Sequence, residues 1–275
     1  MAYHTKIDWC DSSWNPVTGC NHGCEYCYAR GIAERFSPKP LEVMRESDVH
    51  FEDGLLTLDA PVHRYEVMED GLYSDKGITV YPLGFVPTFH KYRLDIPKKW
   101  SEPRTIFVCS MADLFGKWVP DEWIEEVFKA CKAAPQHRYL FLTKNPTRYL
   151  ELADDGKLPM MDNFWYGSTA TTADDRIFHA DMVHTFVSVE PILQRIDCSE
   201  KVGKIAISDW IIVGAETGKR KDKVIPDRAW IQDLAEYAAS VDVPIFMKES
   251  VRDLMGADFK QQFPWQVDSN EKAGR

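Results

Sequence analysis

The sequence predicts an α/β fold built on a parallel sheet, either a barrel or a doubly wound sheet. Short apolar runs rich in β-branched and aromatic residues recur from residue 105 onward, which is typical of strands that are buried on both faces. Helix-like segments fill several of the gaps, and this alternation favours parallel pairing. The predicted strands are residues 105–109, 138–142, 164–167, 185–189, 210–213 and 244–247.

Three segments between these runs have helical patterns. Residues 121–134 carry apolar residues at helical spacing and acidic residues in the first turn, where they favour the helix dipole. Asn145 and Pro146 are expected as the N-cap and first residue of a second helix. Residues 227–240 place apolar side chains on one face. We therefore expect helices on the outside of the sheet.

Residues 37–104 interrupt this rhythm. They are rich in charge, proline and glycine, and we interpret them as an insertion or lid. A chain of 275 residues suits one domain with an insertion of this size. The expected organisation is a single domain over residues 1–275.

Composition limits the compartment and the partners. No apolar run approaches the roughly 18 residues that a membrane span needs, and the N-terminus lacks the apolar core of a signal peptide. We expect a cytoplasmic protein with no membrane contact. The formal net charge of -10 does not indicate nucleic-acid binding by the whole surface, although a local basic patch can still provide it.

Polar residues follow every predicted strand. In parallel α/β folds the reactive groups gather at the carboxyl ends of the strands, so these residues are candidates for an active face. The candidates include Ser110, Asp113, Lys144, Ser168, Glu190, Gly214, Glu216 and Lys248.

A cysteine cluster is expected on the same face. Cys20, Cys24 and Cys27 follow a candidate strand at residues 14–19 and precede a helix-like stretch at 29–36. The chain has seven cysteines, and a tight cluster in a reducing compartment is more often a metal site than a set of disulfides. These thiols are therefore predicted to lie on a strand-to-helix loop as metal ligands.

The number of available ligands indicates which metal the cysteines would bind. A closed zinc site wants four ligands, usually as two C-x2-C pairs, and only Cys24 and Cys27 form such a pair. Zinc would need Cys20 together with His22 or Cys10. Three thiolates can instead hold a four-iron cluster with one iron left open. This count favours an iron–sulfur cluster, with zinc and core packing as alternatives.

The remaining cysteines are not predicted to be ligands. Cys109 ends a buried run and Cys131 lies on an apolar helical face, so both are expected in the core. Cys10 and Cys198 are isolated. We therefore expect no second iron–sulfur centre.

The spacing C-x3-C-x2-C, with Tyr26 directly before the third cysteine, resembles the radical S-adenosylmethionine (SAM) superfamily. Longer segments resemble a phage- and bacteria-associated radical SAM family. That resemblance implies a partial (β/α)6 parallel barrel with an inserted segment, a 4Fe–4S cluster on the three cysteines, and SAM as the source of a 5′-deoxyadenosyl radical. It also implies an electron donor of flavodoxin or ferredoxin type. The segments that carry it are DWCDSSWNPVTGC, VPTFHKYRLDIPKKW, FVCSMADLFG, VPDEWI, LTKNPTRY, SVEPIL, DWIIVGAETG and FMKES.

The resemblance also suggests SAM contacts, with one departure. Members of the superfamily carry a Gly-Gly-Glu motif after the second strand, which this sequence lacks; Ser110 and Asp113 stand there instead. Asp113 is expected to accept from the SAM ammonium and Lys144 to pair with its carboxylate. The further candidates for SAM binding are Tyr26, Ser168, Glu190, Gly214 and Glu216.

Two basic stretches suggest the substrate. One comprises Lys91, Arg93, Lys98, Lys99 and Arg104, and the other Lys219, Arg220, Lys221 and Lys223. Cations at the rim of the active face can hold phosphates. We expect a nucleobase or nucleotide, which in phage DNA would have to be flipped out of the duplex, with Lys219, Arg220, Lys221 and Lys248 in contact. The alternatives are a peptide or small metabolite, or a metal-stabilised nucleic-acid-binding module without catalysis.

Overall fold

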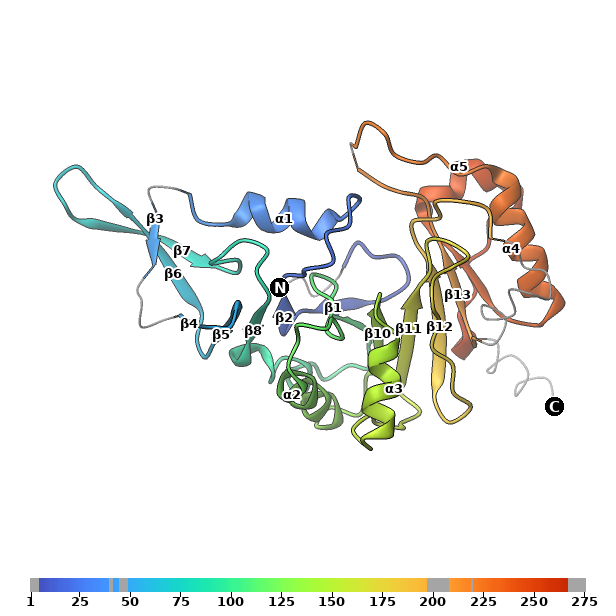
Figure 1. The fold of residues 1–275 in the computed structure, drawn as a ribbon, viewed down its shortest axis with the longest axis horizontal. Helices are drawn as coiled ribbons and strands as arrows, with labels where there is room; N and C mark the ends of the chain where they lie inside the picture. Colours follow the sequence, from blue (N-terminus) through green and yellow to red (C-terminus); the bar gives the residue numbers. More distant parts are fainter. Residues whose placement is uncertain (1–4, 40–41, 45–48, 197–207, 219, 267–275) are drawn as a thin grey trace.

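The computed structural model describes residues 5–39, 42–44, 49–196, 208–218 and 220–266, and its centre is a seven-stranded parallel sheet. The sheet curls into a half-barrel (Figure 1). Its strands follow one another in chain order, with neighbours paired in parallel throughout. The strands are β1 (Ser12–Trp14), β9 (Thr105–Val108), β10 (Arg138–Thr143), β11 (Phe164–Thr169), β12 (His184–Val189), β13 (Ile211–Val213) and β14 (Ile245–Met247). All six apolar runs predicted from the sequence therefore form strands of this sheet, and the α/β class is confirmed.

The prediction of one strand at residues 14–19 was wrong. The chain instead forms two short strands, β1 and β2 (Val17–Thr18), on either side of Pro16. Strand β2 leaves the parallel sheet and pairs antiparallel with β8 (Thr88–His90). Since proline has no backbone N–H to donate to a ladder, it suits the point where the chain changes sheets.

Helices cover part of the sheet. Helix α2 (Asp121–Lys132) connects β9 to β10, α3 (Thr147–Asp154) connects β10 to β11, and α4 (Arg228–Ser240) connects β13 to β14. Residues 170–183, all of them described, contain no helix between β11 and β12, so the βα alternation is incomplete. Within the described residues, no helix is both long and apolar enough to cross a bilayer. The other helices of the described residues are α1 (Tyr28–Phe36), η2 (Lys91–Arg93), η3 (Pro97–Lys99), η6 (Glu249–Val251), α5 (Arg252–Met255) and η7 (Gly256–Asp258).

Helices α4 and α3 begin with different N-cap residues. Asp227 caps α4, because its carboxylate accepts from Ala229 N at 2.9 Å. The prediction for Asn145 was wrong. Pro146 occupies the N-cap position of α3, while Asn145 Nδ2 donates to the Phe115 carbonyl at 2.9 Å. The amide thus ties the β10 exit to the β9 exit.

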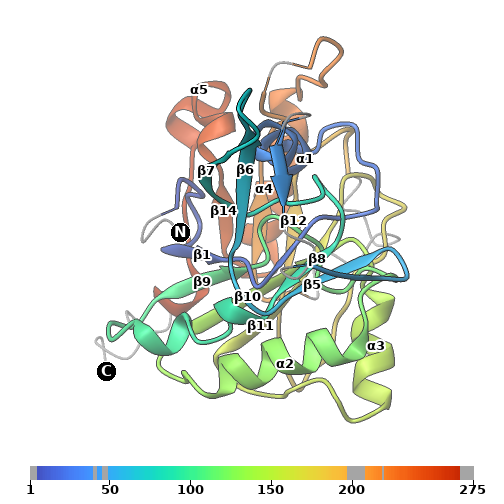
Figure 2. The same cartoon turned by 90° about the vertical axis from the view of Figure 1, so that its left-hand side faces the viewer.

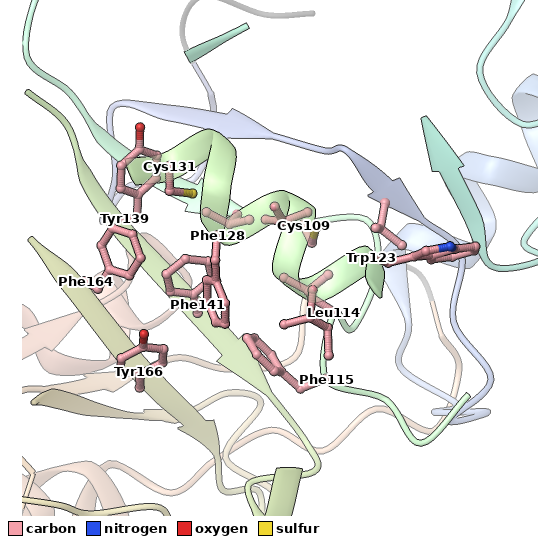
Figure 3. Packing of buried hydrophobic residues seen from close by; sticks show 14 of the residues in the cluster. Cys109, Leu114, Phe115, Trp123, Phe128, Cys131, Tyr139, Phe141, Phe164 and Tyr166 are labelled. Carbon is pink, nitrogen blue, oxygen red and sulfur yellow. The ribbon is translucent and has the colours of Figure 1, made fainter. Parts of the chain in front are cut away.

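The core between α2 and the sheet is mainly aromatic (Figure 3). Phe128 of α2 lies with its ring centroid 5.3 Å from that of Phe141, which in turn stacks on Tyr166 at 5.5 Å. Each such side chain contributes about 1.5–3 kcal/mol by burial. Cys109 and Cys131 lie buried in this cluster, which confirms their predicted place in the core.

The inserted segment forms two small sheets. One has the order β2-β8-β5-β4 and joins the half-barrel through β2, and the other has the order β3-β6-β7. The three-stranded sheet projects from the side of the molecule opposite α4 (Figure 1), and Figure 2 views the molecule from that side. The strands are β3 (Glu42–Met44), β4 (His50–Glu52), β5 (Leu55–Leu58), β6 (Val62–Val67) and β7 (Tyr73–Thr79).

Candidate functional site

The three clustered cysteines lie on the segment between β2 and α1, which we call the cysteine loop (residues 19–27). Its start is anchored from two sides. Gly19 N donates to the Met111 carbonyl at 2.9 Å, just beyond the end of β9, and Cys20 N donates to the Phe85 carbonyl at 3.2 Å. The loop therefore lies at the carboxyl edge of the parallel sheet, as the sequence predicted.

Glycine is required at the start of this loop. Gly19 has a φ of +85°, a conformation that L side chains rarely adopt. A Cβ atom there would also lie 2.2 Å from the Val86 carbonyl oxygen. The inserted segment and the cysteine loop thus approach each other more closely than any side chain would allow.

The thiols differ in surroundings. Cys27 is the N-cap residue of α1, and its Sγ accepts from Arg30 N at 3.4 Å. The pKa of the Cys20 thiol is raised to about 12, mainly by burial, with the nearby Asp113, Cys24 and Cys27 acting in the same direction. The three cysteines are therefore close enough to influence one another electrostatically.

The three thiols of the cysteine loop are candidate ligands for a metal ion or a cluster. Every cysteine in the described part of the chain is a free thiol, and Cys198 lies outside it. In that part, no group of three or more His, Cys, Asp or Glu side chains is arranged to hold a single metal ion. Cys20, Cys24 and Cys27 are therefore the candidate metal or cluster ligands that the structure places on one loop.

Asp113 fastens the cysteine loop to the sheet. Its Oδ2 lies 2.7 Å from His22 Nε2 and accepts from Lys144 N at 2.9 Å. Its Oδ1 accepts from Thr143 Oγ1 at 2.7 Å and Phe115 N at 3.0 Å. A carboxylate offers about four lone-pair positions, and the protein itself fills them. The residue expected to accept from the SAM ammonium therefore acts in this structure as a positioning residue for the loop.

Tyr26 and Lys144 lie together beside the cysteines. Lys144 Nζ is 5.4 Å from the centroid of the Tyr26 ring, within the range of a cation–π contact. Burial is the main cause that raises the pKa of the Tyr26 phenol, and the nearby Cys24 acts in the same direction. The aromatic residue before the third cysteine thus lies beside the exit of β10.

The two serines have structural partners. Ser110 Oγ donates to Asn15 Oδ1 at 3.2 Å, and the Ser110 carbonyl accepts from the Tyr28 hydroxyl at 2.6 Å. Ser168 is fully buried, and its Oγ accepts from Phe178 N at 2.9 Å. Ser110 is therefore joined to the start of α1, whereas Ser168 lies within β11 and holds the segment that follows this strand.

The remaining strand exits form ion pairs across the site. Lys248, after β14, pairs with Glu190, after β12. The Lys248 side chain crosses Gly214, where a Cβ atom would lie 2.9 Å from its Cδ. The carboxyl edge of the sheet thus carries a cation–carboxylate pair beside the end of β13.

Arg220 joins the loop after β13 to the cysteine loop. Its guanidinium donates to both oxygens of Glu216 at 2.7 Å and lies 3.4 Å from Glu25 Oε2. Two of the predicted substrate cations, Arg220 and Lys248, therefore form ion pairs with carboxylates of the protein. Lys221 is exposed, and Lys219 lies outside the described residues.

The first basic stretch is not a continuous surface. Arg93 is 4% exposed, and its Nη1 donates to the Asn15 carbonyl at 2.9 Å. Lys91 pairs with Asp59 at 3.3 Å. Since these cations stabilise the protein itself, the stretch does not offer a row of free charges to phosphates.

Comparison with known proteins places the chain in a family. The family model described as "Protein of unknown function (DUF5131)" matches residues 4–255. The chain belongs to the DUF5131 family. Comparisons with curated proteins and with solved structures found no match. The matched range takes in the cysteine loop and all seven strands, so the site described above lies within the DUF5131 region.

Sequence reasoning missed two contacts of this DUF5131 site. The sequence suggests His22 only as a zinc ligand, whereas in the structure it contacts Asp113, 91 positions away. The sequence suggests no role for Glu25, which contacts Arg220 across 195 positions. The ionisable residues between the cysteines indicate that polar contacts form there, but they do not identify the partners.

Proposed function

We propose that the protein is a radical SAM enzyme that holds a 4Fe–4S cluster on Cys20, Cys24 and Cys27. The observation that carries the proposal is the placement of three free thiols on one strand-to-helix loop at the carboxyl edge of a parallel half-barrel. Active sites of parallel α/β barrels lie at this edge. The sequential strand order is compatible with a partial (β/α)6 barrel of the radical SAM type.

The cluster and SAM would supply the radical chemistry, and the side chains of the protein would position them. When bound, the cluster and SAM supply the one-electron cleavage of a sulfonium C–S bond that yields a 5′-deoxyadenosyl radical. The chain's own residues hold the loop in place: Asp113 through His22, and Arg220 through Glu25. The electron comes from a donor of flavodoxin or ferredoxin type, and the free thiols fit a reducing, cytoplasmic compartment.

We assign SAM binding to charged side chains that follow the strands near the cysteine loop. Lys144 makes no ion pair with any described residue and lies over Tyr26, so its ammonium is proposed to bind the SAM carboxylate. Glu190 and Lys248 supply one carboxylate and one cation at the opposite exits. Their pair is proposed to open toward the SAM amine or the substrate.

The proposed substrate is a nucleobase or nucleotide, free or in phage DNA, which the enzyme modifies or rearranges. Support comes from Lys221 and Lys223, which are exposed on the loop that Arg220 fastens to the cysteine loop. Cations at this rim suit a phosphate. A peptide or small metabolite would use the same cations for carboxylates.

One anaerobic experiment separates the classes. The purified protein is reduced with dithionite in the presence of SAM, and 5′-deoxyadenosine is measured by mass spectrometry. We expect its formation, and a mass change in an added nucleotide or oligonucleotide but not in a peptide. A colourless protein that contains zinc and releases no 5′-deoxyadenosine would support a metal-stabilised binding module instead.

A further inference from the structure

The three-stranded sheet β3-β6-β7, which we call the arm sheet, has one charged face. Side chains alternate along a strand, and residues directly opposite each other in an antiparallel pair point to the same side. On the charged face, Arg64 pairs with Glu42 at 3.4 Å. Lys76 pairs with Glu66 at 2.6 Å on the same face. These charges satisfy one another, as is usual on the solvated side of an antiparallel sheet.

The opposite face of the arm sheet is apolar, and it is exposed. Its polar members are His63 and Asp75, whose Nδ1 and Oδ2 atoms lie 2.9 Å apart. Since an antiparallel sheet usually buries its apolar face, the adjacent exposed side chains here are typical of an interaction surface. The strand register places Tyr65 on this face together with Val43, Val67, Ile78 and Tyr73, which are 40%, 46%, 52% and 67% exposed.

The edges of the arm sheet are protected against strand addition, whereas its apolar face is open. Strand β7 is at one end of the order β3-β6-β7, and a bulge interrupts its pairing with β6. Lys76 lies in this irregular stretch. Strand β3, at the other end, is only three residues long. Because bulges, lysines and short edge strands disfavour pairing with a further strand, a partner would contact the face of the sheet and would not extend it.

Charge limits what can cover the apolar face. Residues 42–79 contain ten Asp and Glu residues and three Lys and Arg residues, so they carry seven of the ten net negative charges of the chain. Glu69 and Asp70 are exposed in the turn between β6 and β7. A nucleic acid, an anionic membrane surface or the arm sheet of a second copy would be repelled. A protein surface with Lys and Arg around an apolar centre would be attracted.

The dimensions of the arm sheet match one helix. Three strands about 4.8 Å apart span roughly 10 Å, which is the diameter of an α-helix. The central strand β6 has six residues, and its length of about 20 Å equals that of roughly 13 helical residues. The arm sheet projects from the side of the molecule (Figure 1), so a helix of another protein could approach it.

We propose that the apolar face of the arm sheet binds one amphipathic helix of another protein, in which Lys and Arg flank the apolar stripe. Apolar side chains of the helix would cover Val67, Tyr73 and Ile78. Its basic side chains would approach Glu69 and Asp70. This interaction does not depend on the proposed radical chemistry.

Fluorescence anisotropy with labelled synthetic peptides tests the proposal on the full chain. The probe is a helical peptide with leucine along one face and lysine along the other. One matched peptide carries glutamate in place of lysine, and a second carries alanine in place of leucine. We expect saturable binding of one leucine–lysine peptide per chain, and at least about tenfold weaker binding of both matched peptides. Absence of binding, or equal binding of the leucine–lysine and alanine–lysine peptides, would overturn the proposal.

Substitutions on the apolar face test the location. Val67→Ser together with Tyr73→Ser removes one cross-strand apolar pair and should weaken binding by at least about tenfold. Met182→Ser together with Ile225→Ser is the matched control, because these side chains are 73% and 78% exposed and lie outside the arm sheet. Circular dichroism checks that each variant is folded. Equal weakening in the two double variants would show that the peptide binds elsewhere and would overturn the proposal.

Sedimentation velocity of the protein alone tests a second copy as the occupant. We expect the same sedimentation coefficient for the original chain and for the variant with Val67→Ser and Tyr73→Ser. A dimer that these two substitutions dissociate would assign the apolar face to a second copy and would contradict the proposed helix.

Discussion

His22 Nε2 lies 2.7 Å from Asp113 Oδ2, although 91 positions separate the two residues. This contact joins the cysteine loop to the exit of β9. The rings of His22 and Trp118 pack in a T-shaped arrangement with their centroids 4.8 Å apart. Since Asp113 also bonds with the β10 exit, the loop is fixed to two strands of the sheet.

Replacement of Asp113 should therefore destabilise the fold. Asp113→Asn puts an amide donor where the carboxylate now accepts from Lys144 N and contacts His22. Leaving such buried groups unsatisfied costs about 1–3 kcal/mol. Urea denaturation measures the loss. The control is Asp181→Asn, since Asp181 also contacts a histidine but its side chain is 96% exposed; an equal loss in both variants would contradict the assigned role.

The glycine before the first cysteine offers a second test. Gly19→Ala adds a Cβ atom that would lie 2.2 Å from the Val86 carbonyl oxygen. Gly23→Ala is the matched control, because Gly23 also has a positive φ but has nothing within 4 Å of the added atom. The control should lose about 1–2 kcal/mol from backbone strain. Gly19→Ala should lose at least about 2 kcal/mol more, because of the collision. Similar unfolding free energies would show that the two segments can separate without cost.

Two buried histidines should make stability depend on pH. Burial is the main cause that lowers the pKa of His90 and His137 below the ordinary value of 6.5. The unfolded chain then binds more protons below pH 6.5 than the folded chain. The contribution of each histidine to the free energy of unfolding is therefore complete above pH 6.5. It is lost as the pH decreases toward the folded pKa, by at most about 1.4 kcal/mol per pH unit for each group.

Denaturation at pH 7.5, 6.0 and 5.0 measures this dependence. His90→Gln should flatten it, since His90 is fully buried with its Nε2 2.9 Å from Thr18 Oγ1. His50→Gln should leave it unchanged, because the His50 side chain is 66% exposed. The same flattening in both variants would contradict the attribution to burial.

Arg220 should limit local opening of the cysteine loop and of the loop after β13. In Arg220→Gln, the Glu216 side chain, which is 2% exposed, loses its paired guanidinium, and Glu25 loses its contact with the loop after β13. We expect faster amide exchange over residues 20–28 and 214–218, measured by hydrogen–deuterium exchange. Arg195→Gln removes a surface pair with Asp233 and should leave these regions unchanged. Unaltered exchange in Arg220→Gln would show that the ion pairs do not hold the loop.

The sheet could be predicted because its information is local. Residues 138–142 and 185–189 are continuous apolar runs, and burial on both faces produces that pattern at any position in a parallel sheet. The start of the sheet was harder to recognise. Ser12–Trp14 is only three residues long and alternates in burial, so the apolar pattern gave no clear boundary before Pro16.

The site was predictable only in outline. Strand exits and cysteine spacing indicate which residues share an edge, and the structure brings the described ones to that edge. The partners of Asp113 and Arg220 depend on contacts across 91 and 195 positions. Nothing in the residues near either position specifies such contacts. Asn145 shows the same limit, since its long-range bond with Phe115 replaced the local cap that its position suggested.

The most direct test of the account is the iron and acid-labile sulfide content of anaerobically purified protein. We predict about four of each per chain, with broad visible charge-transfer absorbance. Cys20→Ala, Cys24→Ala and Cys27→Ala should each lose the cluster, and Cys10→Ala, the same change at a free cysteine outside the loop, should keep it. A folded protein without iron and sulfide, or equal loss of iron in Cys10→Ala, would contradict a cluster held by these three thiols.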